Sequence, residues 1–250
     1  MPAVVRALAV LDLLARERQA LSMARVASQL ALPKSSVHGL CNTLLSSGYL
    51  RRASDGAMQI GPAVMALAEA FVASTSVAGE FDRLWQEGHA PEETLILSVL
   101  NGSEVIYVAV RHGSRPLGLA FHVGMRLPAH LSATGKSLLA HLPEARLRAL
   151  LPADPLPRLT AQGASTAAEL RAELAACRTQ GYSVDDEGIR EGVVALAAPI
   201  FDATGQAVAA VGVCLNKAVL GAGQMDRQKQ VVQEAARTLS RRLGARPAEA

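Results

Sequence analysis

The sequence contains few cysteines and no long hydrophobic run. Cys41, Cys177 and Cys214 are odd in number and far apart. No Cys-x-x-Cys or Cys/His spacing points to zinc, so we expect reduced thiols and no bound metal. No apolar stretch approaches the roughly 20 residues that a membrane helix needs. The N-terminus begins a helical pattern at once, without the apolar stretch or cleavage site of a signal peptide. These absences predict a cytoplasmic protein without a membrane partner.

The sequence also lacks a coherent set of catalytic residues. Ala133–Ser137, ATGKS, resembles the end of a phosphate-binding loop, but such a loop needs glycine at position 130, where this chain has His130. No Gly-x-Ser-x-Gly motif is present, and no spacing supports a triad of Ser132, His130 and Asp185. The run Asp185–Glu187 could be a paired-carboxylate acid site or a metal site, although such a run is more often a solvated turn. We therefore expect no enzyme and no cofactor.

Basic residues are concentrated at one end of the chain. With 250 residues, half of them hydrophobic, the chain is long enough for one large or two small domains. Residues 1–61 hold seven basic against three acidic side chains, whereas the remainder holds 18 basic against 19 acidic ones. A basic N-terminal part on a nearly neutral body is typical of a DNA-binding module attached to a second domain. Chance asymmetry within one ordinary domain is the alternative.

The stretch from Pro33 to Leu44, PKSSVHGLCNTL, predicts the recognition helix of a helix-turn-helix. Pro33 suits the first helical position, where a missing N–H costs nothing. One apolar stripe recurs at helical spacing, at Val37, Leu40, Cys41 and Leu44. The opposite face carries residues that contact phosphates and base edges, together with one glycine: Lys34, Ser35, His38, Gly39 and Asn42. An ordinary amphipathic surface helix is the alternative for this stretch taken alone.

Two further helices precede this stretch. Residues 4–16 predict a first helix, in which Val5, Leu8, Ala9 and Asp12 are spaced by turns and Leu11 and Leu14 complete a wide apolar face. Ser22 can cap a second helix over residues 23–30, because its hydroxyl can accept a hydrogen bond from an exposed backbone N–H. Residues 31–32 then form the turn, which completes the helix-turn-helix unit.

A short hairpin follows the recognition helix. Residues 48–52 and 58–60 are strand-like, and Asp55-Gly56 suits the turn between them. A hairpin in this place predicts the wing of a winged helix, on which Arg51 and Arg52 would meet phosphate or a narrow minor groove. Solubility alone is the alternative role of each arginine. The full set of expected DNA-binding residues is Arg25, Lys34, Ser35, Ser36, His38, Gly39, Asn42, Arg51 and Arg52.

A change of pattern divides the rest of the chain. We expect a DNA-binding domain at residues 1–61, a linker helix at 62–78 and an α+β domain at 79–250. The apolar stripe of the linker helix could pack against the same helix of a second subunit or within its own chain. The last domain should contain strands at 94–100, 104–110, 117–123, 182–184, 193–200 and 207–215. Its helices should lie at 132–141, 143–151, 166–180, with Gly181 as a C-cap, and 224–243.

Five blocks in this order resemble the IclR-type transcriptional regulators. They are residues 6–11 (RALAVL), 32–38 (LPKSSVH), 131–140 (LSATGKSLLA), 181–187 (GYSVDDE) and 197–202 (AAPIFD). The resemblance implies an N-terminal winged helix-turn-helix and a C-terminal GAF/profilin-like effector domain. It also implies a homodimer, often paired into a tetramer, on a palindromic double-stranded DNA operator near a catabolic operon. Repression and activation are both open.

The same resemblance implies a small organic acid as effector, often a carboxylate or an aromatic acid. Carried over by position, its site would include Leu119, Leu127, Ala133, Thr134, Asp185, Val193, Ala195, Gly212 and Cys214. Members that bind small acids have a cysteine where this chain has Ala195, and serines near Gly212 and Cys214. Losing those polar groups leaves fewer hydrogen bonds for a compact acid such as glyoxylate. We therefore expect an effector with more apolar bulk, such as an aromatic acid.

A second departure from the family lies in the recognition helix, where Gly39 stands at a position at which arginine is common. Glycine there costs the helix about 1 kcal/mol relative to alanine and removes a DNA contact. Two other functions fit parts of the sequence: a small-molecule enzyme fused to a winged helix, and a winged helix that binds protein.

Overall fold

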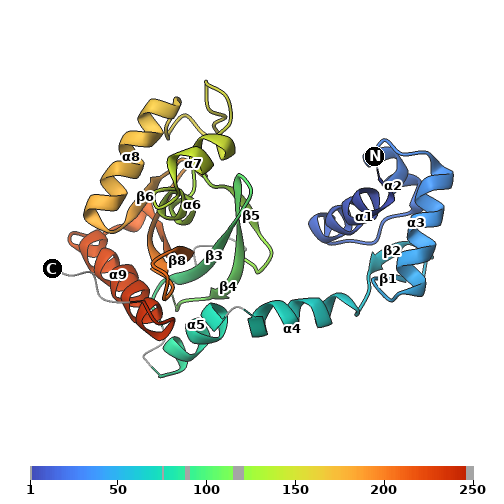
Figure 1. Cartoon of the computed structure of the whole chain (residues 1–250), viewed down its shortest axis with the longest axis horizontal. Helices are drawn as coiled ribbons and strands as arrows, with labels where there is room; N and C mark the ends of the chain where they lie inside the picture. Colours follow the sequence, from blue (N-terminus) through green and yellow to red (C-terminus); the bar gives the residue numbers. More distant parts are fainter. Residues whose placement is uncertain (1, 75, 88–90, 115–120, 246–250) are drawn as a thin grey trace. The chain divides into compact units, whose positions relative to one another are not determined.

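The computed structural model describes residues 2–74, 76–87, 91–114 and 121–245. The chain divides into two compact units, Met1–Ser74 and Thr75–Ala250 (Figure 1). Among the described residues, no helix combines the length and the apolar character needed to cross a membrane.

The N-terminal unit contains a three-helix bundle, a two-stranded antiparallel hairpin and one further helix. Its elements are α1 (Ala3–Glu17), α2 (Met23–Gln29), α3 (Lys34–Ser46), β1 (Leu50–Arg52), β2 (Met58–Ile60) and α4 (Val64–Ser74). The Ser22 hydroxyl caps α2 by accepting a hydrogen bond from the Arg25 amide at 3.3 Å, as predicted. Pro33 precedes α3 as its N-cap, one position before the predicted one.

The core of this unit confirms the stripe predicted for α3 and only part of the wide face predicted for α1. Val37, Cys41 and Leu44 of α3 are buried, and Leu40 is half-buried. In α1 the buried residues are Val10, Leu13 and Leu14, whereas Val5 and Leu8 are about half exposed, at 46% and 56%. Leu14 is buried and Leu11 packs against the core as predicted, whereas the prediction was wrong for Val5 and Leu8, because α1 is apolar on more than one side and two helical stripes fit its sequence.

The C-terminal unit is built on a six-stranded antiparallel sheet with strand order β5-β4-β3-β8-β7-β6. Its elements are α5 (Ser76–Glu87), β3 (Thr94–Asn101), β4 (Glu104–Arg111), β5 (Arg126–Pro128), α6 (Ala133–Leu139), α7 (Glu144–Leu150), α8 (Ala167–Gln180), β6 (Ser183–Asp186), β7 (Val193–Phe201), β8 (Ala207–Asn216), a 3-10 turn (Lys217–Val219) and α9 (Gln224–Arg242). An α+β domain was predicted, and this sheet with its helices confirms it.

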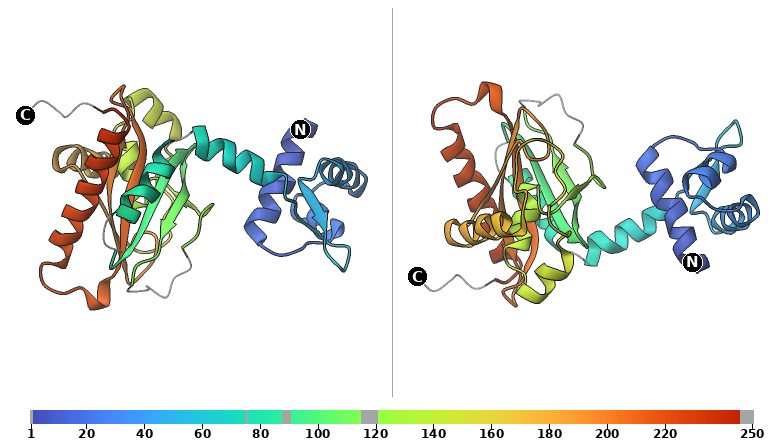
Figure 2. Two further views of the ribbon diagram at one scale, coloured as in Figure 1. Left: turned by 90° about the horizontal axis from the view of Figure 1, so that it is seen from below. Right: turned by 90° about the horizontal axis from the view of Figure 1, so that it is seen from above.

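Helices cover both faces of the sheet, as Figure 2 shows for α9 on one of them. Phe81 of α5 and Leu239 of α9 pack on that face against strand residues such as Val211. Residues of α6 and α8, including Leu138 and Leu174, form a second core on the opposite face. The sheet is therefore covered by helices on both faces, and any site between the strands and α6 lies on the second of these faces.

Several predicted elements differ from the structure. One linker helix was predicted at residues 62–78, whereas the structure has α4 and α5, and Val77 and Ala78 of α5 are buried in the C-terminal core. The strand predicted at 117–123 falls partly outside the described residues, and 121–123 is not a strand. On the side of β4 away from β3, the strand that pairs with it is instead β5, in which Leu127 lies opposite Val105.

Candidate functional site

The exposed face of α3 carries the residues predicted to contact DNA. Lys34, Ser35, His38, Gly39 and Asn42 are exposed; Ser35, Gly39 and Asn42 lie opposite the buried stripe of the helix, and Lys34 and His38 lie beside it. An added Cβ at Gly39 would meet no atom within 4 Å, so that part of the helix backbone is open to an approaching surface. Two other residues were predicted to contact DNA. Ser36 of α3 is half-buried, and Arg25, which belongs to α2, is exposed.

Two side chains on this face are joined by a hydrogen bond. The Asn42 amide nitrogen lies 3.1 Å from Nδ1 of His38, one helical turn away. An amide nitrogen can only donate, so Nδ1 of the imidazole accepts and its hydrogen lies on Nε2. The pair therefore presents an N–H of His38 together with an oxygen and a second N–H of Asn42.

The hairpin after α3 presents two arginines. Arg51 and Arg52 are exposed on β1 and lie opposite Gln59 and Met58 of β2. The guanidinium of Arg52 donates to the carbonyl of Gly56 in the turn at 3.3 Å. A positive hairpin next to a helix with polar, exposed side chains fits the polyanionic backbone of a nucleic acid.

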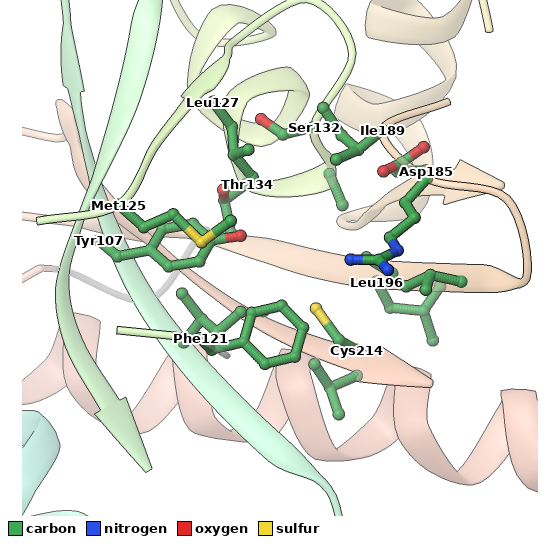
Figure 3. A pocket seen from close by; sticks show the side chains of 17 residues that line it. Tyr107, Phe121, Met125, Leu127, Ser132, Thr134, Asp185, Ile189, Leu196 and Cys214 are labelled. Carbon is green, nitrogen blue, oxygen red and sulfur yellow. The ribbon is translucent and has the colours of Figure 1, made fainter. Parts of the chain in front are cut away.

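A cavity of about 100 Å³ lies in the C-terminal unit, between the sheet and α6 (Figure 3). Tyr107, Phe121 and Met125 gather on one side of it, and Asp185 and Ile189 lie on the other. The complete lining is Ile96, Tyr107, Phe121, Met125, Leu127, Ser132, Ala133, Thr134, Asp185, Ile189, Arg190, Val193, Ala195, Leu196, Gly212, Val213 and Cys214.

The cavity contains every predicted effector residue that the structure describes. Leu127, Ala133, Thr134, Asp185, Val193, Ala195, Gly212 and Cys214 all line it, and Leu119 lies outside the described residues. Sequence reasoning missed Tyr107, Phe121, Met125 and Arg190. Arg190 lies three residues after the acidic run Asp185–Glu187. This closeness to Asp185 is the sequence signal that could have identified Arg190 as a lining residue.

Asp185 is a buried carboxyl and not part of a solvated turn, which corrects the general expectation for an acidic run. It lies in β6, where side chains alternate between the two faces, so Asp185 points inward at 4% exposure while Asp186 is exposed. Burial raises the pKa of Asp185 to about 6, although the Lys136 ammonium and a 2.7 Å hydrogen bond from the Gly188 amide both lower it. Burial, followed by the nearby Asp185 charge, raises the pKa of the Cys214 thiol to about 12.

Thr134 brings an unsatisfied hydroxyl to the cavity. Thr134 is 4% exposed, and its Oγ1 is buried without a hydrogen-bond partner. Its methyl group occupies the space that Gly212 leaves, because a Cβ added at Gly212 would lie 2.8 Å from Cγ2 of Thr134. Glycine at position 212 therefore makes room for threonine at position 134. The sequence predicted fewer polar groups in the site because the family's serines near Gly212 are missing, and the hydroxyl of Thr134 supplies one.

The residues of the unsupported enzyme motifs have structural partners. The Ser132 hydroxyl caps α6, and Nε2 of His130 lies 2.9 Å from the carbonyl oxygen of Pro157. The buried Lys136 ammonium contacts a carboxylate oxygen of Glu173 at 2.7 Å. Within the described part of the chain, no three His, Cys, Asp or Glu side chains gather as a metal site requires.

Comparison with known proteins assigns both units to one family. The model of the IclR helix-turn-helix domain matches residues 3–54, and that of the bacterial transcriptional regulator IclR C-terminal domain matches residues 57–241. The HTH-type transcriptional regulator XynR of Escherichia coli is 28% identical, covering 96% of each chain. The Pca regulon regulatory protein of Pseudomonas putida is 30% identical, over 85% of this chain and 74% of its own.

Solved structures agree with this assignment. An IclR homologue from Microbacterium hydrocarbonoxydans, solved in complex with 4-hydroxybenzoate, has a TM-score of 0.79 and 26% identity, covering 97% of this chain and 99% of its own. The chain thus belongs to the IclR family of DNA-binding bacterial transcriptional regulators.

Proposed function

We propose that this protein binds a duplex operator through α3 and the β1–β2 hairpin, and that a one-ring organic acid in the cavity alters that binding. The observation that carries the effector part is the cavity itself, whose largely apolar lining includes an unsatisfied hydroxyl at Thr134. A regulator of catabolic genes that responds to their substrate is the biological role that this chemistry supports.

The lining favours a ligand with an apolar body and one polar end. Tyr107, Phe121 and Met125 provide apolar and aromatic surface suited to a flat ring. Arg190 offers a guanidinium, which pairs well with a carboxylate. A buried hydroxyl without a partner costs free energy, which a ligand that hydrogen-bonds to Thr134 would recover.

The cavity is slightly too small for the proposed ligand as it stands. It measures about 100 Å³, whereas an apolar cavity of about 150 Å³ holds benzene, so binding of a one-ring acid requires side chains of the lining to move. The 4-hydroxybenzoate bound to the homologue is an acid of this class.

The DNA-binding part of the proposal is based on charge and exposure. Lys34, Arg51 and Arg52 are exposed cations that can neutralise phosphates, and the polar face of α3 can enter a major groove. Recognition of a palindrome needs two copies of the unit. Exposed apolar side chains on α1 and α4 suit contact with a second copy: Val4, Val5, Leu8, Met65 and Leu67.

A thermal-shift experiment tests the effector class. Benzoate and 4-hydroxybenzoate are expected to raise the Tm of the C-terminal unit, whereas pyruvate and glyoxylate are not. Thr134→Val keeps the shape of the side chain and removes the hydroxyl, so affinity for benzoates should fall about tenfold. Thr179→Val, at an exposed position on α8, is the matched control and should leave affinity unchanged. Tight binding of glyoxylate with no binding of benzoates would contradict the proposal.

A further inference from the structure

We propose that His38 and Asn42 read base edges as one coupled unit, in which the amide of Asn42 recognises adenine and Nε2–H of His38 donates to the neighbouring base. This inference rests on the proposed DNA binding by α3. The observation behind it is the 3.1 Å hydrogen bond between the two side chains on the exposed face of the helix.

The hydrogen bond fixes what each side chain offers to DNA. Because the amide nitrogen of Asn42 donates one hydrogen to Nδ1 of His38, the imidazole accepts at Nδ1 and offers its N–H at Nε2. Asn42 keeps its carbonyl oxygen and its second N–H, which together form an acceptor–donor pair. His38 keeps one N–H donor.

This set matches some base edges and not others. Adenine presents an N6 donor beside an N7 acceptor in the major groove, which is the complement of the free edge of Asn42. The N–H of His38 needs an acceptor, which a purine N7, a guanine O6 or a thymine O4 provides, whereas cytosine presents a donor there. The pair thus predicts a half-site with an adenine whose neighbour carries a major-groove acceptor.

The surroundings of the pair allow the required approach. Gly39 lies between the two side chains in sequence and leaves open space where a side chain would project. Val37 and Cys41 fix the orientation of the helix by packing into the core on its opposite face. Because the hydrogen bond holds both polar side chains in one arrangement before DNA arrives, less side-chain entropy is lost on binding.

Two other roles of these residues make different predictions. A pair that contacts phosphates would strengthen binding to every sequence, because phosphates carry no sequence information. A hydrogen bond that only stabilises the surface of α3 would affect helix stability and leave base preference unchanged.

The test begins with selection of bound duplexes from a random-sequence pool by the full-length protein. Binding of the selected duplex and of an unrelated duplex is then measured by fluorescence anisotropy for wild type, His38→Ala, Asn42→Ala and the double variant. Lys34→Ala, on the same face, is the control for a phosphate contact and should weaken binding to both duplexes equally.

Each single variant should lose about 5- to 150-fold in affinity for the selected duplex, the range expected for one good base contact. Affinity for the unrelated duplex should be unchanged. The double variant should lose much less than the product of the two single losses, because the residues act as a unit. Replacing the predicted adenine should affect the wild type but not Asn42→Ala.

Equal losses on both duplexes would overturn the inference in favour of phosphate contacts, and unchanged affinity would overturn it in favour of a structural role. Losses that multiply in the double variant would refute the coupling. In all three cases the wild-type protein still selects a sequence, so the proposed function stands. A wild type that binds no duplex would refute the proposed function and this inference with it.

Discussion

Replacing Asp185 by asparagine should make the C-terminal unit more stable at neutral pH. Asp185 is 4% exposed, and burial raises its pKa from 3.8 to about 6. The folded protein therefore binds this proton more tightly than the unfolded chain does, and the ionised carboxylate opposes folding. Asparagine removes the charge and keeps an oxygen that can accept the amide hydrogen of Gly188.

The size of the effect follows from the shift in pKa. A shift of about two units corresponds to roughly 3 kcal/mol at pH 8, where the carboxyl is ionised in both states. For a unit of this size, that free energy corresponds to a rise in Tm of about 6–12 °C. The penalty falls as the pH drops below the folded pKa: about half of it remains at pH 5, and about a fifth remains near pH 4, where the unfolded carboxyl also begins to be protonated.

The assay can follow the C-terminal unit selectively. Trp85 is the single tryptophan of the sequence, and it packs against the core of this unit from α5. Its fluorescence, recorded during thermal unfolding of the full chain at pH 5 and pH 8, should show a larger gain for Asp185→Asn at pH 8. Asp186→Asn is the matched control, because Asp186 is exposed and contacts Lys217 at 2.7 Å. It should give no gain.

A lower Tm for Asp185→Asn at pH 8 would refute this reasoning, and so would a gain that is the same at both pH values. The first result would mean that the carboxylate stabilises the fold through its partners. The second would mean that the gain comes from packing and not from charge. A carboxyl that is retained although it opposes folding is typical of a functional site.

Three further predictions concern DNA binding, cavity shape and effector binding. Gly39→Arg should tighten DNA binding in a mobility-shift assay, because the position is exposed and open. The same substitution should stabilise the N-terminal unit by about 0.5–1 kcal/mol in thermal unfolding. Weaker DNA binding would count against position 39 facing DNA. Gly212→Ala should destabilise the C-terminal unit by about 1–3 kcal/mol, since the added Cβ would lie 2.8 Å from Cγ2 of Thr134. Adding Thr134→Ala should restore part of that loss in Trp85-monitored unfolding, and no restoration would mean that the backbone, and not Thr134, limits the space. Benzoate affinity measured by calorimetry should fall from pH 6 to pH 8, because ionised Asp185 repels an anion, and Asp185→Asn should remove this dependence; a fall that persists in the variant would exclude Asp185 as its cause.

Local sequence patterns correctly predicted the features that depend only on neighbouring residues, such as which side of a helix is buried and where a helix ends. The stripe at Val37, Cys41 and Leu44 has helical spacing and becomes the buried side of α3. Gly181 ends α8 in the left-handed conformation predicted for a C-cap, with φ of 76°. Such features depend on residues close in sequence, so they can be recognised without the structure.

Features that depend on packing between distant segments were missed. The strand β5 has three residues and is defined by pairing with β4. The helix α5 was not predicted as a separate helix, because one linker helix was placed over residues 62–78 and no helix was predicted between residue 79 and the first strand, yet Phe81 is fully buried against the sheet. Likewise, Tyr107 lines the cavity because its side of β4 faces α6. The alternation of side chains along β4 shows that the strand has two faces but not which of them is next to the cavity.

The effect of an effector on DNA affinity is the most direct test of the central claim that the cavity controls DNA binding. The Kd of the full-length protein for a duplex selected from a random pool should be measured by anisotropy at several salt concentrations, with and without saturating 4-hydroxybenzoate. Binding should weaken steeply with salt, as phosphate contacts require, and the ligand should change the Kd by about 5- to 150-fold. A Kd that is the same with and without bound ligand would contradict control of DNA binding by the cavity, and binding that does not depend on salt would contradict recognition of DNA by this basic surface.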